Sequence, residues 1–156
     1  MRLSNSLLQF CFPVLGLTLM LCAAGCGNPS YEVVKVHGTV TYKGQPLTRG
    51  DISFIPVQVE GDTMRRMGVS AINEQGEYVL NSFKPGDGVI PGEYKVIISS
   101  RDKASTEASD EEVAARKWYA PKVYSDVATT PLKATISSDS PQPVKLDFSL
   151  EGELPN

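Results

Sequence analysis

The sequence predicts an all-β fold: a seven-stranded, mostly antiparallel β-sandwich with one short helix near residues 110–119. The main observation is that seven short segments beyond residue 31 alternate apolar and polar residues, as strands with one buried face do. Turns rich in glycine and proline separate these segments, at spacings too tight for helical crossovers early in the chain. The length of 156 residues suffices for one domain with a real core.

Four strands are predicted before the glycine- and proline-rich loop at 84–92. Each alternates, so that every second side chain points to the same face. Between the third and the fourth, Asn73-Glu74-Gln75-Gly76 predicts a hairpin turn in which Gly76 takes a positive φ. The four strands are expected at residues 32–43, 50–57, 64–72 and 77–83. Their predicted core-facing residues are Val34, Val36, Gly38, Val40, Tyr42, Ile52, Phe54, Met67, Val69, Ala71, Tyr78, Leu80 and, past a bulge, Phe83.

Three more strands are predicted after the glycine- and proline-rich loop at 84–92. The last of them alternates most regularly, with Lys145, Asp147 and Ser149 on its polar side. These strands are expected at residues 93–100, 132–138 and 144–150. Their predicted core-facing residues are Tyr94, Val96, Ile98, Leu132, Ala134, Ile136, Val144, Leu146, Phe148 and Leu150.

An insertion at residues 101–131 interrupts the strand pattern. Ser109 and Glu112 have the spacing of a capping box, and acidic residues at 110–112 suit a helix N-terminus. We therefore predict a helix from about 110 to 119, which Pro121 ends. Trp118 is expected to share a helix face with Ala114 and to cover an open end of the core.

The first 25 residues are predicted to be an export signal. A basic residue at position 2 precedes an uncharged apolar run from Leu7 to Ala24, and small residues follow. The alternative is an uncleaved transmembrane helix. The run of 18 residues is at the lower limit for spanning a bilayer, and Pro13 and Gly16 weaken a long helix.

The end of this signal, Ala23-Ala24-Gly25-Cys26, resembles the lipobox of bacterial lipoproteins. The resemblance implies cleavage before Cys26, a diacylglyceryl thioether on its sulfur and an acyl chain on its amine. The alternative is a chance cysteine; Ala23 is less typical than leucine. If Cys26 is acylated as the resemblance implies, residues 26–31 form a short tether and the lipid holds the chain at a membrane. Gly27, rather than aspartate, favours the outer membrane of the cell envelope.

Three segments of the predicted domain, residues 32–150, resemble carboxypeptidase-regulatory-like (transthyretin-like) domains. They are VHGTVTYKGQPL at 36–47, NEQGEY at 73–78 and PGEYKV at 91–96. Together with the lipobox, the loop at 84–92 and Tyr124-Ser125-Asp126, they resemble small envelope lipoproteins of planctomycete bacteria. This implies a transthyretin-like sandwich with no established reaction, followed by a tail at 151–156.

The chemistry of the sequence argues against an enzyme. The single histidine, His37, excludes any site with two histidines, and the hydrolases and dioxygenases with related folds need at least two. After the predicted cleavage only Cys26 remains, so neither an intramolecular disulfide nor a zinc site is expected. Asp87 stands alone between glycines, so no calcium site is expected there. An amide cross-link between Lys35 and Asp147 is a minor alternative, because both lie on polar faces.

The expected function is therefore an interaction or structural module of the cell envelope, with no cofactor besides the covalent lipid. A formal net charge of −3 argues against nucleic acid as a partner. An envelope protein could bind the loops or a sheet edge. The alternative is a carbohydrate-binding module that uses Trp118, Tyr119 and Tyr124, since aromatic faces stack on sugar rings.

Overall fold

A computed structural model describes residues 31–58, 66–103 and 107–155 of the chain. The compact unit that it shows runs from Glu32 to Asn156. The predicted export signal, Cys26 and nearly all of the tether lie outside the described residues. Among the described residues, no helix is long and apolar enough to cross a membrane.

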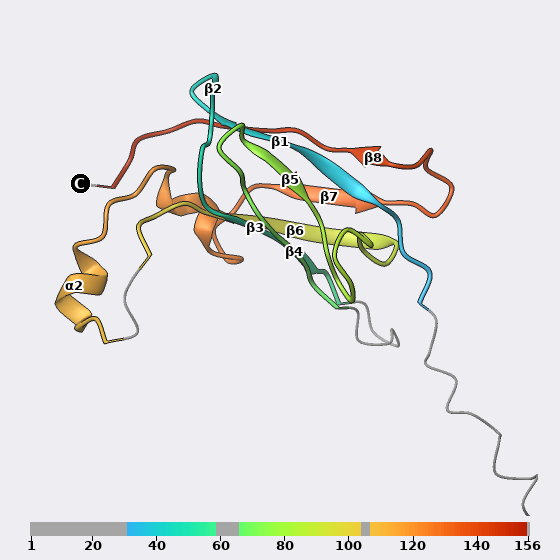
Figure 1. Ribbon diagram of the computed structural model, residues 1–156, viewed down its shortest axis with the longest axis horizontal. Helices are drawn as coiled ribbons and strands as arrows, with labels where there is room; N and C mark the ends of the chain where they lie inside the picture. Colours follow the sequence, from blue (N-terminus) through green and yellow to red (C-terminus); the bar gives the residue numbers. More distant parts are fainter. Residues whose placement is uncertain (1–30, 59–65, 104–106, 156) are drawn as a thin grey trace, which may run out of the picture. The chain divides into compact units, whose positions relative to one another are not determined.

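Two β-sheets pack face to face, so the predicted all-β sandwich with mostly antiparallel pairing is confirmed at this level (Figure 1). The central strand of the first sheet is β1 (Val36–Tyr42). Its other strands are β2 (Gln45–Pro46), β5 (Glu77–Val79), β8 (Val144–Lys145) and β9 (Phe148–Leu150). The second sheet has the antiparallel order β4 (Gly68–Ala71), β3 (Asp51–Pro56), β6 (Gly92–Ser99), β7 (Lys133–Ile136).

The core lies between the two sheets, and the predicted alternation supplies most of it. Val36 and Val40 of β1 are buried, as are Ile52 and Phe54 of β3. In β6 and β7 the buried residues are Tyr94, Val96, Ile98, Ala134 and Ile136. Aromatic rings meet at the centre, where the ring of Phe54 lies 5.9–6.4 Å from those of Tyr78, Tyr94 and Phe148.

The predicted orientation of β4 is wrong. Met67, Val69 and Ala71 are exposed, whereas Gly68 is buried. The alternation is real, but Val89 fills the space beneath the strand. A Cβ atom on Gly68 would lie 2.2 Å from Val89 Cγ1, so only glycine fits inward there. The apolar side chains of β4 consequently face outward.

Phe83 is also wrongly predicted as a core residue, since it is exposed. It belongs to a loop that Asp87 holds together. The Asp87 carboxylate accepts hydrogen bonds from the backbone N–H groups of Ser82, Phe83 and Lys84 at 2.8–3.0 Å. Desolvation alone would raise the pKa of Asp87, but these donors outweigh it and lower the pKa. Asp87 therefore organises the loop that turns Phe83 outward.

The turn at residues 73–76 is confirmed, but the prediction that it joins a hairpin is wrong. Gly76 has a φ of +80°, and the Asn73 side-chain oxygen accepts hydrogen bonds from the N–H groups of Gln75 and Glu77. However, the flanking strands belong to different sheets, because β4 pairs with β3 and β5 pairs with β1. The turn therefore carries the chain from one layer to the other.

The strand predicted at 144–150 is divided into β8 and β9, both parallel to β1. Between them the Leu146 carbonyl crosses close to Gly38 and accepts the Tyr78 hydroxyl at 2.6 Å. Asp147 accepts hydrogen bonds from the backbone N–H and the hydroxyl of Thr39 at 2.8 and 2.9 Å. The Asp147 carboxylate thus accepts the Thr39 N–H in place of a backbone carbonyl at the point where pairing with β1 is interrupted.

The helix in the insertion is α2 (Asp110–Ala114), which is shorter than predicted. The capping box of Ser109 and Glu112 is confirmed. The chain leaves the helix early because its backbone pairs with the end of β6: the N–H of Asp102 donates to the Lys117 carbonyl, and the N–H of Tyr119 donates to the Ser100 carbonyl. A 3-10 helix, η2 (Lys122–Ser125), follows.

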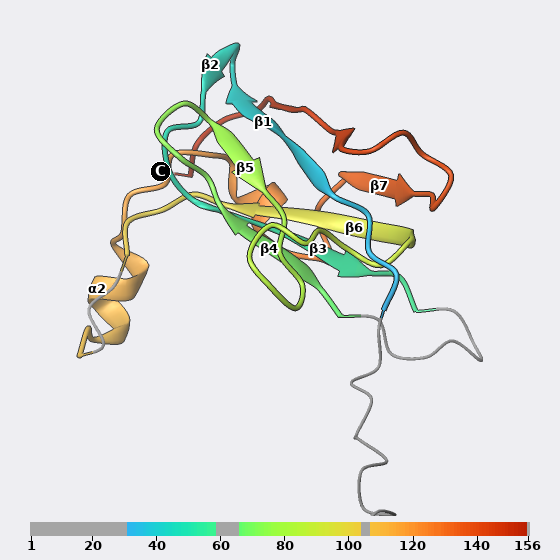
Figure 2. The same ribbon diagram turned by 45° about the vertical axis from the view of Figure 1, so that its right-hand side comes forward.

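The two ends of the sandwich differ. Figures 1 and 2 both show α2 and the C-terminal segment at one end. The start of the described chain and the loop between β5 and β6 lie at the other end. A short antiparallel bridge between Val34 and Val89 joins that loop to the first described residues.

Candidate functional site

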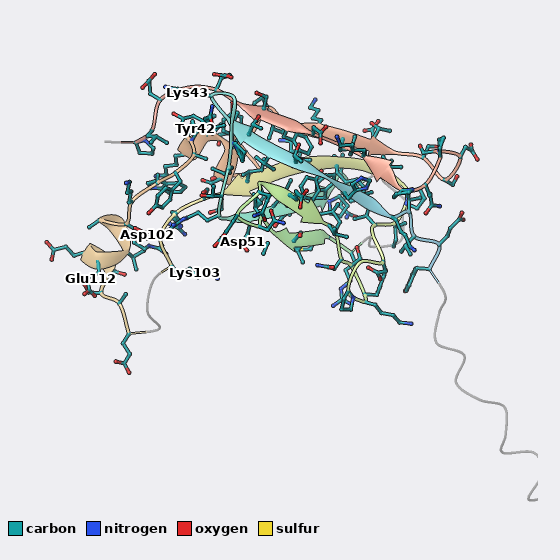
Figure 3. The ribbon with its side chains drawn as sticks, turned by 45° about the horizontal axis from the view of Figure 1, so that its top comes forward. Tyr42, Lys43, Asp51, Asp102, Lys103 and Glu112 are labelled. Atoms are coloured by element: carbon teal, nitrogen blue, oxygen red, sulfur yellow. The ribbon has the colours of Figure 1, made fainter. Side chains whose placement is uncertain are left out.

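The insertion closes a cleft of about 330 Å³ at the end of the sandwich that carries α2. Its wall combines the end of β6, one side of α2, Trp118 and η2. Figure 3 shows Asp102 and Lys103 on the segment that leads from the sheets towards α2, which carries Glu112. The charged residues at the cleft are Arg101, Asp110, Lys122 and Asp126.

Trp118 is the aromatic residue of the cleft wall. Its backbone forms an isolated bridge with Arg101, whose guanidinium lies 5.2 Å from the centre of the Trp118 ring. The side chain is only half-buried and does not belong to the buried core of the described residues. The expected role as a core plug is therefore wrong, because Trp118 lies beyond the end of α2 and not on its inner face.

Tyr119 belongs to a separate polar cluster. Its hydroxyl donates to the Asp102 carboxylate at 2.9 Å, and the Arg49 guanidinium lies 4.5 Å from its ring centre. Arg49 and Asp102 also form an ion pair at 3.6 Å. The hydrogen bond to Asp102 raises the pKa of Tyr119. This cluster joins the chain after β2 to the start of the insertion.

Tyr124 is a structural residue. It is buried, and its hydroxyl donates to the Glu151 carbonyl at 3.0 Å and accepts the Glu151 N–H at 3.1 Å. The side chain therefore fastens the C-terminal segment to the insertion.

The three aromatic residues predicted as one contact surface thus have three different surroundings. Only Trp118 lines the cleft. Sequence reasoning missed the four charged residues around it, although Asp110 had been assigned to the helix start. The only signal was that they all fall within or beside the insertion. An indole face with nearby charges of both signs can bind a ligand that has one apolar face and several hydroxyl or charged groups.

The other chemical candidates stay separate. His37 lies within β1, where its carbonyl accepts the N–H of Leu146. The Lys145 ammonium donates a hydrogen bond to the Asp147 carboxylate in an ion pair at 3.0 Å, and this bond lowers the pKa of Asp147. Among the residues that the structure describes, no group of three or more His, Cys, Asp or Glu side chains is placed to hold a metal ion.

Comparison with known proteins adds no relative: no family model, no curated protein and no solved structure matches the chain.

Proposed function

We propose that the chain is a membrane-anchored lipoprotein of the bacterial cell envelope that works as a non-enzymatic interaction or structural module. The observation that carries the proposal is the position of Cys26, directly after small residues and shortly before the compact unit that begins at Glu32. Acyl chains on Cys26 would anchor the domain, since each buried methylene contributes about 0.8 kcal/mol. Gly27 favours the outer membrane as the location.

We further propose that the sandwich is a seven-stranded, transthyretin-like domain of the carboxypeptidase-regulatory-like kind found in planctomycete lipoproteins. The positions of the three sequence segments support this. Residues 36–47 include β1 and β2, residues 73–78 form the turn into β5, and residues 91–96 include the first half of β6. Figures 1 and 2 show that the described chain enters the sandwich at the end opposite α2.

The anchor is tested by the intact mass of the chain purified from membranes of a bacterium that makes lipoproteins. We expect a chain that starts at Cys26 and carries the mass of its acyl groups. A matched control is Cys26→Ser exported behind a leader that an ordinary signal peptidase removes. This soluble Cys26→Ser chain should appear in the soluble fraction, and its circular dichroism spectrum should equal that of the acylated chain. A bare thiol at Cys26, or a control that still sediments with membranes at high salt, would refute the anchor.

A second function, carbohydrate binding, is favoured by the Trp118 cleft. The indole offers an apolar face for a sugar ring, and Asp110, Lys122 and Asp126 offer polar partners for hydroxyl groups. Tyr119 and Tyr124 are not part of this proposal, because Asp102 and Glu151 engage their hydroxyl groups elsewhere.

Carbohydrate binding predicts that Trp118→Ala weakens retention of the soluble Cys26→Ser chain on insoluble polysaccharides about tenfold, the loss expected for one stacking contact. The measurement is a pull-down on peptidoglycan, chitin and cellulose. Phe83→Ala removes an exposed aromatic at the other end and should leave retention unchanged. Equal retention of both variants, or none of the parent on any matrix, would exclude this function.

A further inference from the structure

An exposed apolar surface lies on the outside of β4 and β5. Val79 is 53% exposed, Met67 49% and Phe83 38%, and Val69 is exposed beside them. The inward side of β4 carries Gly68 and Ser70 instead. The apolar side chains of this strand therefore face outward, the reverse of the usual arrangement, and exposed apolar side chains gathered on neighbouring segments mark a site of interaction.

The four side chains, which we call the β4–β5 patch, come from segments that contact one another. The Ser70 hydroxyl accepts the N–H of Val79 at 3.2 Å, and Val69 bridges to Asn81 through paired backbone hydrogen bonds of 2.9 and 3.0 Å. The Ser82 hydroxyl donates to the Met67 carbonyl at 3.4 Å. These bonds hold the patch together as one surface.

Basic side chains border the β4–β5 patch. The Arg66 guanidinium lies 5.4 Å from the ring centre of Phe83, and the exposed Lys84 follows Phe83 in the loop. The nearest acidic side chain of the loop, Asp87, is occupied by three backbone N–H groups. The part of the border around Phe83 therefore offers cations beside an aromatic side chain, whereas the exposed Glu77 lies on the Val79 side.

The patch lies near the point where the chain enters the sandwich. His37 of β1 is paired with Val79, and Val34 is bridged to Val89 at the end of the patch-bearing loop. Figures 1 and 2 show this loop beside the first described residues. The segment from Cys26 to Glu32 spans at most about 20 Å when fully extended. A lipid on Cys26 would thus keep the bilayer surface within reach of the patch.

We propose that the β4–β5 patch rests on the surface of the lipid bilayer that holds the anchor; this inference depends on the proposed acylation of Cys26. Met67, Val69, Val79 and Phe83 enter the boundary between headgroups and acyl chains, where apolar and aromatic side chains are favoured. Arg66 and Lys84 meet the phosphates of anionic lipids. The lipid and the patch then make two contacts, which fix the orientation of the domain and direct the Trp118 cleft away from the membrane.

The test uses the full acylated chain in vesicles of phosphatidylglycerol and phosphatidylethanolamine. Acylation blocks Cys26, so Met67→Cys supplies a single thiol for an environment-sensitive fluorophore. Val123→Cys is the matched control, because Val123 is similarly exposed but lies in η2 beside the cleft. We expect a blue-shifted emission and severalfold quenching by spin-labelled lipids at position 67, and neither effect at position 123. Phe83→Cys repeats the measurement from the loop and should resemble position 67.

The outcomes separate this inference from the proposed anchor. Water-like emission at positions 67 and 83 in a chain whose intact mass shows the acyl groups overturns the membrane contact and leaves the anchor standing. A chain without acyl groups overturns both. If the label at position 67 is already shielded in the soluble Cys26→Ser chain, in a concentration-dependent way and without vesicles, the patch is an interface between copies and the membrane contact is wrong.

Discussion

Replacement of Gly38 with alanine is expected to destabilise the sandwich by about 3 kcal/mol or more. A Cβ atom on Gly38 would lie 1.7 Å from the Leu146 carbonyl oxygen and 2.6 Å from its carbon. Both are backbone atoms, so no side-chain rotation relieves the overlap. The segment between β8 and β9 must move away from β1, which also breaks the hydrogen bond from the Tyr78 hydroxyl to Leu146.

The expected loss of stability is opposite in sign to the usual effect of replacing glycine with alanine in a strand. Gly38 does not have a positive φ, and alanine in an ordinary strand stabilises by about 0.5–1 kcal/mol relative to glycine. The measurement is urea unfolding of the soluble Cys26→Ser chain, followed by far-ultraviolet circular dichroism. Tyr78→Phe is the control that removes the hydrogen bond without the overlap, and about 1–2 kcal/mol is expected for it. Gly38→Ala at or above parent stability would contradict the close crossing of Leu146.

Alternation predicted the buried faces of β1, β3, β6 and β7 because most of the large apolar residues of each strand lie on one side, although Ile55 and Ile97 lie on the other. In β4 the same pattern predicted the wrong face. Alternation separates two faces but does not say which one points inward. That depends on Val89, a residue outside the strand that occupies the space beneath Gly68. Long-range packing of this kind leaves no local signal in the sequence.

The parallel arrangement of β8 and β9 beside β1 also lay beyond the sequence pattern. Residues 144–150 alternate without a break, yet the pairing is interrupted at Leu146 and Asp147. The interruption is possible because Gly38 lacks a side chain and because Thr39 supplies two donors to Asp147. Both conditions belong to a strand more than a hundred residues away.

The candidate site was predicted only in part. The capping box located α2, since its two residues act locally. The end of the helix depended on backbone pairing between residues 117–119 and 100–102, which competes with the helix and which no local pattern reveals. The side chains of Trp118, Tyr119 and Tyr124 therefore point to different surroundings, although they are close in sequence.

Phe54→Ala is the second substitution with a large expected effect. Phe54 is fully buried in β3, and its ring has aromatic neighbours at Tyr78, Tyr94 and Phe148. Removing the Phe54 ring leaves a cavity between the two sheets. The aromatic neighbours cannot fill this cavity because the backbone of each is fixed in a strand. The expected loss of unfolding free energy is about 3–5 kcal/mol, a large part of the stability of a domain of this size.

Phe83→Ala is the matched control for Phe54→Ala, since it removes the same atoms from an exposed ring. It should change the unfolding free energy by less than about 1 kcal/mol in the soluble Cys26→Ser chain. The comparison also tests the β4–β5 patch, because a residue that is held outward for a membrane contact adds little to the fold alone. Equal losses for the two variants would mean that Phe83 is packed in the core and does not belong to the β4–β5 patch.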